Sequence, residues 1–132
     1  MLFTVGDKFR EKFHVSHAVY EGFISIFKDK NQLHTDESFA TGHGFKKRVM
    51  YGNILNGFLS FFIGECLPDK KVIIHSQEIQ YKNPVYLNDE LTLAAEVTGI
   101  SESVGVVEFK FNFKNSDALV VAKGKIQIGL LK

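Results

Sequence analysis

The chain has 132 residues, of which 45% are hydrophobic and 23% are charged, and this composition is ordinary for a globular domain that buries its own core. The formal net charge of +1 argues against a nucleic-acid-binding protein, which would carry a clear basic excess. Cys66 is the only cysteine, so the chain can form no intrachain disulfide and offers no second thiolate for a metal site.

The chain shows no targeting or membrane-spanning pattern. No signal-peptide pattern opens the sequence, and the longest apolar stretch, residues 54–67, is too short to cross a bilayer. No repeat or linker interrupts it. We therefore expect a single domain over residues 1–132 in the cytoplasm, with no membrane or nucleic-acid partner.

The first half of the chain predicts one strand, one helix and a long polar segment. Residues 7–15 form a candidate strand, and Ser16 is a suitable N-cap for a helix that begins at His17. Helical spacing gives this helix one apolar face, made of Val19, Tyr20, Phe23, Ile24 and Phe27. Residues 28–49 are polar, so we expect a long loop with a short helical piece over residues 37–41, and a loop of this length is often functional.

The second half predicts a buried helix followed by strands. Residues 52–65 have almost no polar face, which is typical of a helix inside a core, and Pro68 ends this helix. Residues 72–81 predict a strand, and three further strands alternate apolar with polar residues. Their apolar members are Leu91, Leu93, Ala95 and Val97, then Val107, Phe109, Phe111 and Phe113, then Ala122, Gly124, Ile126 and Ile128.

An apolar helix followed by a four-strand meander has few packing solutions. The sheet can curl around the helix so that each covers the apolar surface of the other. The predicted class is therefore α+β, with a curled antiparallel sheet wrapped around a central apolar helix, which is the hot-dog fold. The 13 phenylalanines suit such a core, or an apolar substrate tunnel.

The polar segment carries a motif that resembles a known family. The segment 29–40 resembles the signature of the MaoC-like dehydratases and R-specific enoyl-CoA hydratases, matching at Asp29, Asn31, Leu33, His34, Asp36 and Ala40. The family's central helix opens with His-Gly-Met, where this chain has Tyr51-Gly52-Asn53, and Ser60 stands at the spacing of a typical family serine. Residues 83–91 resemble a later family turn.

Three departures from the family pattern affect the same region. Gln32 replaces the usual proline, which loosens the loop, and Phe27-Lys28 replaces Ser-Gly. Tyr51 replaces the histidine before the glycine. These departures leave the acid/base pair in place and put the choice of substrate and the rate in question.

The resemblance implies a hydro-lyase that interconverts a 3-hydroxyacyl thioester and a trans-2-enoyl thioester, with R stereochemistry at carbon 3. It implies that Asp29 and His34 hold one water and share the proton transfers, as an acid/base pair can. The backbone N–H of Gly52, at a helix N-terminus, would stabilise the enolate charge of the thioester. Asn31, Tyr51 and Ser60 are the candidate substrate-binding residues.

The resemblance also implies what the enzyme does not need. No metal and no redox cofactor are expected, and coenzyme A or phosphopantetheine enters only as part of the substrate, on CoA or on an acyl carrier protein. At least a homodimer is expected.

Several residues carry a second interpretation. Asn31 could organise the loop, Ser60 could bond back to its own helix, and Tyr51 could be a packed aromatic. The run 46–48, Lys-Lys-Arg, is more typical of a solvated loop than of a phosphate contact. Cys66 fits a buried structural thiol.

Alternative functions use the same fold. A hot-dog thioesterase usually places a carboxylate on the central helix, but the only acidic residue there, Glu65, lies at the far end. A non-catalytic acyl-thioester-binding subunit is suggested by the departures at Gln32 and Tyr51. A site for a non-acyl substrate, such as a modified sugar intermediate, also stays open.

Overall fold

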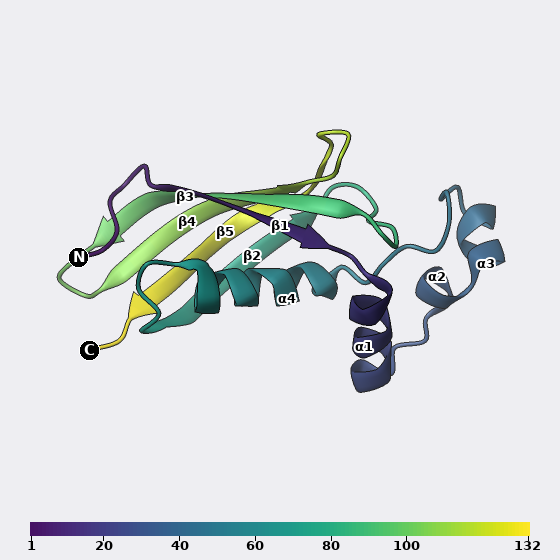
Figure 1. Ribbon diagram of the computed structural model, residues 1–132, viewed down its shortest axis with the longest axis horizontal. Helices are drawn as coiled ribbons and strands as arrows, with labels where there is room; N and C mark the ends of the chain where they lie inside the picture. The colour runs from purple at the N-terminus through teal and green to yellow at the C-terminus, as the bar shows by residue number, and fades with distance from the viewer.

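Five strands form one antiparallel sheet in the computed structural model, which describes all 132 residues. The sheet curls along α4 (Asn53–Phe61), which lies against its inner face (Figure 1). The strand order across the sheet is β1-β3-β4-β5-β2. The strand bounds are β1 Lys8–His14, β2 Val72–Tyr81, β3 Glu90–Ser101, β4 Val106–Lys114 and β5 Val120–Leu130.

The predicted four-strand meander is wrong in one respect. Only β3, β4 and β5 follow one another as neighbours, whereas β2 pairs with β5 at one edge and β1 pairs with β3 at the other. The alternation of a strand shows which face is buried, but it does not show which neighbour it pairs with. The connection from β2 to β3 is long enough to cross the end of the sheet, so no hairpin forces the two strands together.

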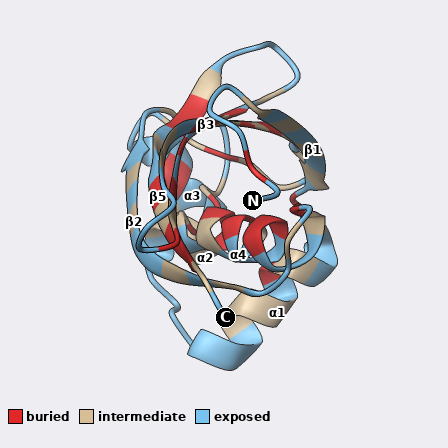
Figure 2. Cartoon of the chain, turned by 90° about the vertical axis from the view of Figure 1, so that its left-hand side faces the viewer, coloured by how far each residue is buried: buried red, intermediate tan, exposed pale blue.

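The alternating residues do face the core as predicted. Phe109 and Phe113 on β4 are 1% and 0% exposed, while Lys110 and Lys114, which follow them, are exposed. Edge-on contacts join the phenylalanines of the sheet and the helix, including Phe62 against Phe109 with ring centroids 6.4 Å apart. Figure 2 shows the buried residues gathered between α4 and the inner face of the sheet.

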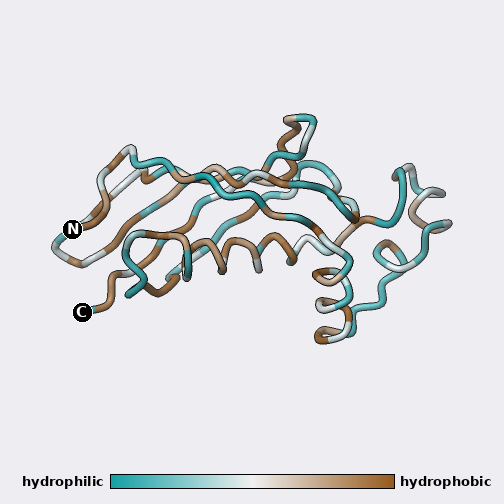
Figure 3. The backbone as a smooth tube through the Cα atoms, in the orientation of Figure 1, coloured by the Kyte–Doolittle hydropathy of each residue, from teal (hydrophilic) through white to brown (hydrophobic).

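The central helix is buried on one side only. Ile54, Leu55 and Leu59 face the sheet, and the helix continues as one π-helical segment, η1 (Phe62–Cys66). The opposite side exposes Gly57, Ser60 and Phe61 to solvent. Figure 3 shows α4 mostly in the colours of hydrophobic residues. This composition is typical of a helix that is buried on all sides, whereas within this single chain one side of α4 is exposed to solvent.

Three helices project beyond one end of the sheet (Figure 1). They are α1 His17–Phe27, α2 Gln32–Thr35 and α3 Glu37–Gly42. Ser16 caps α1 as predicted, because its side chain accepts from the backbone N–H of Val19 at 3.1 Å. The short helical piece predicted over residues 37–41 is α3. The sequence did not predict α2, since a single turn shows no periodicity. None of the helices has the length and apolar character that crossing a membrane requires.

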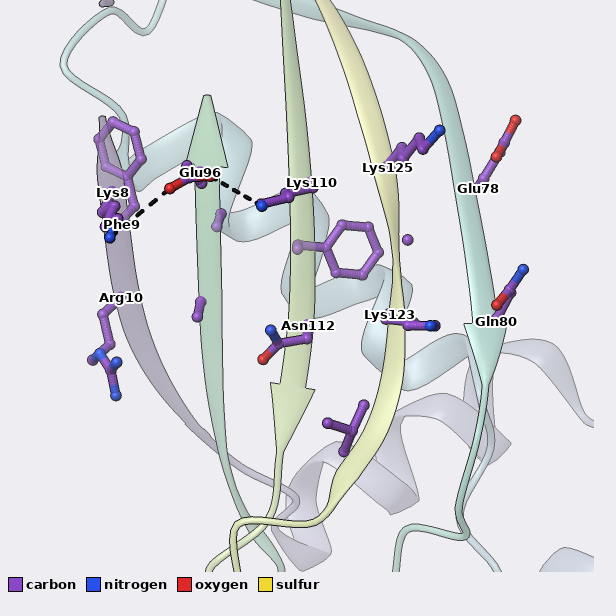
Figure 4. Close-up of a pocket in the computed structure, with 15 residues that line it drawn as sticks. Lys8, Phe9, Arg10, Glu78, Gln80, Glu96, Lys110, Asn112, Lys123 and Lys125 are labelled. Atoms are coloured by element: carbon purple, nitrogen blue, oxygen red, sulfur yellow. Dashed lines mark ion pairs between the residues drawn. The ribbon is translucent and has the colours of Figure 1, made fainter. Parts of the chain in front are cut away.

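The outer face of the sheet forms a charged hollow of about 880 Å³, larger than either cavity beside α4 (Figure 4). Some of these charges compensate one another, because the Glu96 carboxylate pairs with Lys8 at 3.9 Å and with Lys110 at 3.1 Å. The sheet separates this hollow from α4 and from the segment that carries the family motif. The large volume of this hollow is therefore no reason to assign it as the site that the family motif forms.

Candidate active site

Asp29 is held at the end of α1 by a turn that Asn31 continues. The carboxylate of Asp29 accepts from the backbone N–H of Asn31 at 3.0 Å. The side chain of Asn31 in turn accepts from the backbone N–H of Leu33 at 3.0 Å and so caps α2. Asn31 therefore acts as an organiser of this turn, which is one of the two interpretations that the sequence left open.

His34 lies on α2 with a defined tautomer. Its Nδ1 is 2.7 Å from the carbonyl oxygen of Val49, and a carbonyl only accepts, so Nδ1 carries the proton. In the neutral tautomer with this geometry, the lone pair lies on Nε2. The backbone N–H of Val49 returns a bond to the carbonyl of Leu33 at 3.1 Å, which ties α2 to the chain that leads into α4. The bond to Val49 thus orients the ring and leaves Nε2 as the nitrogen that a general base would use.

Tyr51 lies between the two candidate catalytic residues. Its side chain is 3% exposed, and its hydroxyl donates to the backbone carbonyl of Asp29. Its ring lies against the His34 ring, with centroids 4.2 Å apart, and stacks on Phe23 at 4.4 Å. Burial raises the pKa of the Tyr51 hydroxyl, and the nearby Tyr20, Asp29 and Glu21 add to this rise. The hydroxyl therefore keeps its proton at neutral pH and stays a hydrogen-bond donor. Of the two interpretations of Tyr51, its burial supports the packed aromatic.

Two cavities meet at the start of α4. One, of about 680 Å³, is an apolar cleft between α1 and α4, and Asp29 is its only charged lining residue. The other, of about 480 Å³, is lined by His34 and Gly52. Asn53 lines both cavities. Asp29 and His34 make no direct hydrogen bond or ion pair with each other, so both retain free atoms toward these spaces.

Gly52 caps the N-terminus of α4 and has a free donor. The backbone N–H groups of Gly52 and Asn53 find no acceptor within the chain, as expected for the first turn of a helix. A Cβ on Gly52 would lie 2.9 Å from the Tyr81 ring, so a side chain at this position would displace that ring. Glycine therefore keeps the donor accessible beside the cavity that His34 lines.

The structure does not bring Ser60 to this group. Ser60 is exposed on α4, about two turns beyond Gly52, and it lines neither cavity. Gly57, one turn beyond Asn53, lines the apolar cleft instead. Helical spacing alone could not separate these two positions, because both lie on the exposed side of α4.

The basic run 46–48 and Cys66 line neither cavity. Lys46 and Lys47 are exposed, as expected for a solvated loop. Arg48 is half-buried: its guanidinium lies over the Tyr20 ring at 5.2 Å from the centroid and donates to the Tyr20 hydroxyl at 3.4 Å. Cys66 is half-buried at the end of η1, and burial, followed by the charge of Glu11, raises the pKa of its thiol.

Sequence reasoning missed Tyr20 as a residue of this site. The Tyr20 side chain is 3% exposed, and its hydroxyl donates to the backbone carbonyl of His34 at 2.8 Å. Its helical spacing had placed it only on the apolar face of α1. A hydroxyl on that face was the available signal, because a buried tyrosine hydroxyl normally finds a hydrogen-bond partner.

Known proteins with this fold share the sequence pattern as well. A family model described as a MaoC-like domain matches residues 4–115. The (R)-specific enoyl-CoA hydratase of Aeromonas caviae is 34% identical over 98 residues, which cover 74% of this chain and 73% of that protein. The mitochondrial 3-hydroxyacyl-[acyl-carrier-protein] dehydratase of Arabidopsis thaliana is 28% identical over 94% of this chain and 75% of its own length.

The solved structures agree with the sequence comparison. The (R)-hydratase from A. caviae involved in PHA biosynthesis superposes with a TM-score of 0.89 and 27% identity, covering 98% of both chains. The curled sheet around α4 and these matches confirm the predicted hot-dog fold. The chain belongs to the MaoC-like domain family, as its motif predicted.

Proposed function

We propose that this chain is a hydro-lyase that interconverts a 3-hydroxyacyl thioester and a trans-2-enoyl thioester, with R configuration at carbon 3. Relatives named (R)-specific enoyl-CoA hydratase and 3-hydroxyacyl-[acyl-carrier-protein] dehydratase support the activity. The observation that supports the catalytic assignment is that Asp29 and His34 line the two cavities that meet at the start of α4, with Nδ1 of His34 2.7 Å from the carbonyl oxygen of Val49.

Asp29 and His34 divide the proton transfers between them. In hydration, one member of the pair takes a proton from water as the water oxygen bonds to carbon 3, and a proton is delivered to carbon 2. The electron pair of the carbon–carbon double bond moves toward the thioester oxygen, which gains enolate charge. The free N–H of Gly52 at the start of α4 is the proposed donor to that oxygen. Dehydration runs through the same steps in reverse.

The apolar cleft between α1 and α4 suits the acyl chain. Its walls are apolar, and its one charged lining residue, Asp29, would then face the reacting carbons. Gly22 and Gly57 line the cleft, and no atom lies within 4 Å of the position that a Cβ would take at either glycine. This open width suits an acyl thioester on coenzyme A or on an acyl carrier protein, and the chemistry requires no metal or redox cofactor.

Absorbance of crotonyl-CoA at the enoyl-thioester band is the direct test. The wild type should remove this absorbance, and Asp29→Asn and His34→Ala should each lower kcat by about 100- to 10,000-fold. His43→Ala is the matched control, because His43 is exposed and its Nδ1 also meets a backbone carbonyl, that of Phe39 at 2.8 Å. A wild type that is inactive on crotonyl-CoA, on longer enoyl-CoA and on acyl carrier protein substrates would refute the hydratase assignment.

The two alternatives predict different products. A thioesterase would release free thiol from an acyl-CoA, which a thiol reagent detects. Glu65, the only carboxylate of the central helix segment, is exposed and pairs with Lys70 at 3.3 Å, so nothing places it beside the cavities. A binding subunit would bind acyl-CoA without turnover, and Asp29→Asn would then leave all measured activity unchanged.

We further propose that the chain forms a homodimer. Ile26 and Phe27 at the end of α1 are 71% and 67% exposed, and Phe61 on α4 is 54% exposed. Large apolar side chains exposed together favour association. Sedimentation equilibrium should give twice the 14.9 kDa of one chain, and Phe27→Glu should shift the mass toward the monomer. A monomeric wild type at micromolar concentration would contradict the proposal.

A further inference from the structure

We infer that Tyr20 and Tyr51 form a clamp that positions Asp29 against His34, an inference that rests on the proposed function. Each hydroxyl donates to the backbone carbonyl of one member of the acid/base pair. The Tyr20 hydroxyl binds the carbonyl of His34 at 2.8 Å, and the Tyr51 hydroxyl binds the carbonyl of Asp29. Both tyrosines are 3% exposed. We call these two residues the tyrosine clamp.

The segment that the tyrosine clamp holds has little structure of its own. The helix α2 has only four residues, none of them buried, and a single helical turn is unstable without outside contacts. The bonds within the segment are local: the backbone N–H of Asn31 donates to the Asp29 side chain, and that of Leu33 donates to the Asn31 side chain. Apart from the bonds between Val49 and α2, the two tyrosine hydroxyls supply the hydrogen bonds that tie residues 29–34 to α1 and to the chain just before α4.

The two tyrosines cannot move independently. Their rings stack with centroids 5.9 Å apart, and the Phe23 ring also stacks on the Tyr51 ring at 4.4 Å. Arg48 donates to the Tyr20 hydroxyl at 3.4 Å, so that the tyrosine proton stays directed at the carbonyl of His34. A shift of one ring therefore moves both carbonyls, and the distance between Asp29 and His34 is set by one packed unit.

The clamp compensates for a missing proline. Gln32 is the first residue of α2, where the family pattern has proline, and its backbone N–H finds no acceptor in the chain. Asn31 before it has ψ 136°, an extended value that a following proline favours. Proline thus fits position 32 without loss of a hydrogen bond, and it would stiffen the same turn by a different route.

Kinetics on crotonyl-CoA with purified full-length protein test the clamp. Tyr51→Phe and Tyr20→Phe keep the rings and remove one hydroxyl each. We expect kcat to fall about 10- to 100-fold in each, with KM unchanged within about twofold, because a displacement of about 1 Å costs up to about 100-fold. Since one unit is broken in either case, the double variant should lose less than the product of the single losses. Tyr86→Phe is the matched control, because its hydroxyl accepts from Lys46 at 3.2 Å, outside the clamp.

Rescue by proline separates positioning from general stability. Gln32→Pro in the Tyr51→Phe background should raise kcat at least about threefold above that of Tyr51→Phe alone, while the hydroxyl stays absent. A clamp that acted only through global stability would show no such rescue at a temperature where both proteins are folded. A rise in KM with kcat unchanged would overturn the inference, because Tyr51 would then bind substrate directly. Single variants with wild-type kcat would overturn it as well.

Amide hydrogen exchange tests the clamp without any substrate. The N–H groups of Asn31 and His34 are bonded within the segment, to Asp29 and to Asn31, each at 3.0 Å. In the double variant their exchange should accelerate at least about tenfold, while amides of β4 stay unchanged. If the wild type lacks hydratase activity but this acceleration occurs, the proposed function fails and the clamp stands. Unchanged exchange at both amides would refute the clamp.

Discussion

The sheet and the segment from Asp29 to Gly52 are held together in different ways. The sheet has long ladders of backbone bonds and an inner face of packed phenylalanines. The site segment has short helices and depends on single bonds from side chains to backbone, such as those of Asn31 and Tyr51. A substitution in the sheet should therefore lower the stability of the fold, whereas a substitution in the segment should displace the candidate catalytic groups.

The largest expected loss of stability comes from the centre of the sheet. Phe109→Ala should lower the free energy of unfolding by about 3–5 kcal/mol, because Phe109 is 1% exposed and a cavity would remain. Urea denaturation measures this loss. The kcat of molecules that remain folded should stay within about twofold of the wild type, and a large fall in kcat would show that the two regions are coupled.

A pair of glycines contrasts the sheet with the exposed side of α4, which adjoins the site segment. A Cβ on Gly124 of β5 would collide with the backbone carbonyl of Glu78 on β2, so Gly124→Ala should destabilise the fold by about 3 kcal/mol. A Cβ on Gly57 of α4 would meet no atom, so Gly57→Ala should stabilise the helix by up to about 1 kcal/mol. Thermal unfolding of both variants measures the difference, and equal losses would contradict it.

Asn31 should show the opposite pattern to Phe109. Asn31→Ala removes the cap of α2 and should cost only about 1 kcal/mol of stability, because the bond is exposed and local. The loss in kcat should nevertheless exceed tenfold, since α2, which carries His34, loses its cap, whereas the backbone N–H of residue 31 still binds the Asp29 carboxylate. Urea denaturation and crotonyl-CoA kinetics on the same sample measure the two effects. A normal kcat would show that the turn forms without its cap.

The smallest expected effect is a pH dependence of stability. The pKa of Tyr51 is raised above 10.0 by burial, so the folded state keeps the phenol neutral after the unfolded chain ionises. The contribution of the Tyr51 hydroxyl to the stability of the fold is therefore complete below about pH 10, and it is lost as the pH rises from 10.0 through the raised pKa. Between pH 9 and 11, the stability of the wild type should fall more steeply than that of Tyr51→Phe, by at most about 1.4 kcal/mol per pH unit. Parallel curves would show that the hydroxyl ionises freely.

The sequence by itself determined the elements whose pattern is local. Alternation set the buried faces of β3, β4 and β5, and Ser16 set the start of α1, because both depend on residues only a few positions apart. The motif spacing identified the family and the candidate pair Asp29 and His34 in the same way. The apolar α4 predicted its place against the sheet.

Only the tertiary structure decided how distant segments meet. It placed β2 beside β5, because register and neighbour depend on contacts far along the chain. It placed Gly57, and not Ser60, in the cleft with Asp29, since rotation around α4 depends on how that helix packs. It brought the hydroxyls of Tyr20 and Tyr51 to the two carbonyls of the pair, over separations of 14 and 22 residues. A local sequence pattern does not predict such contacts, because they form only when the whole chain is packed.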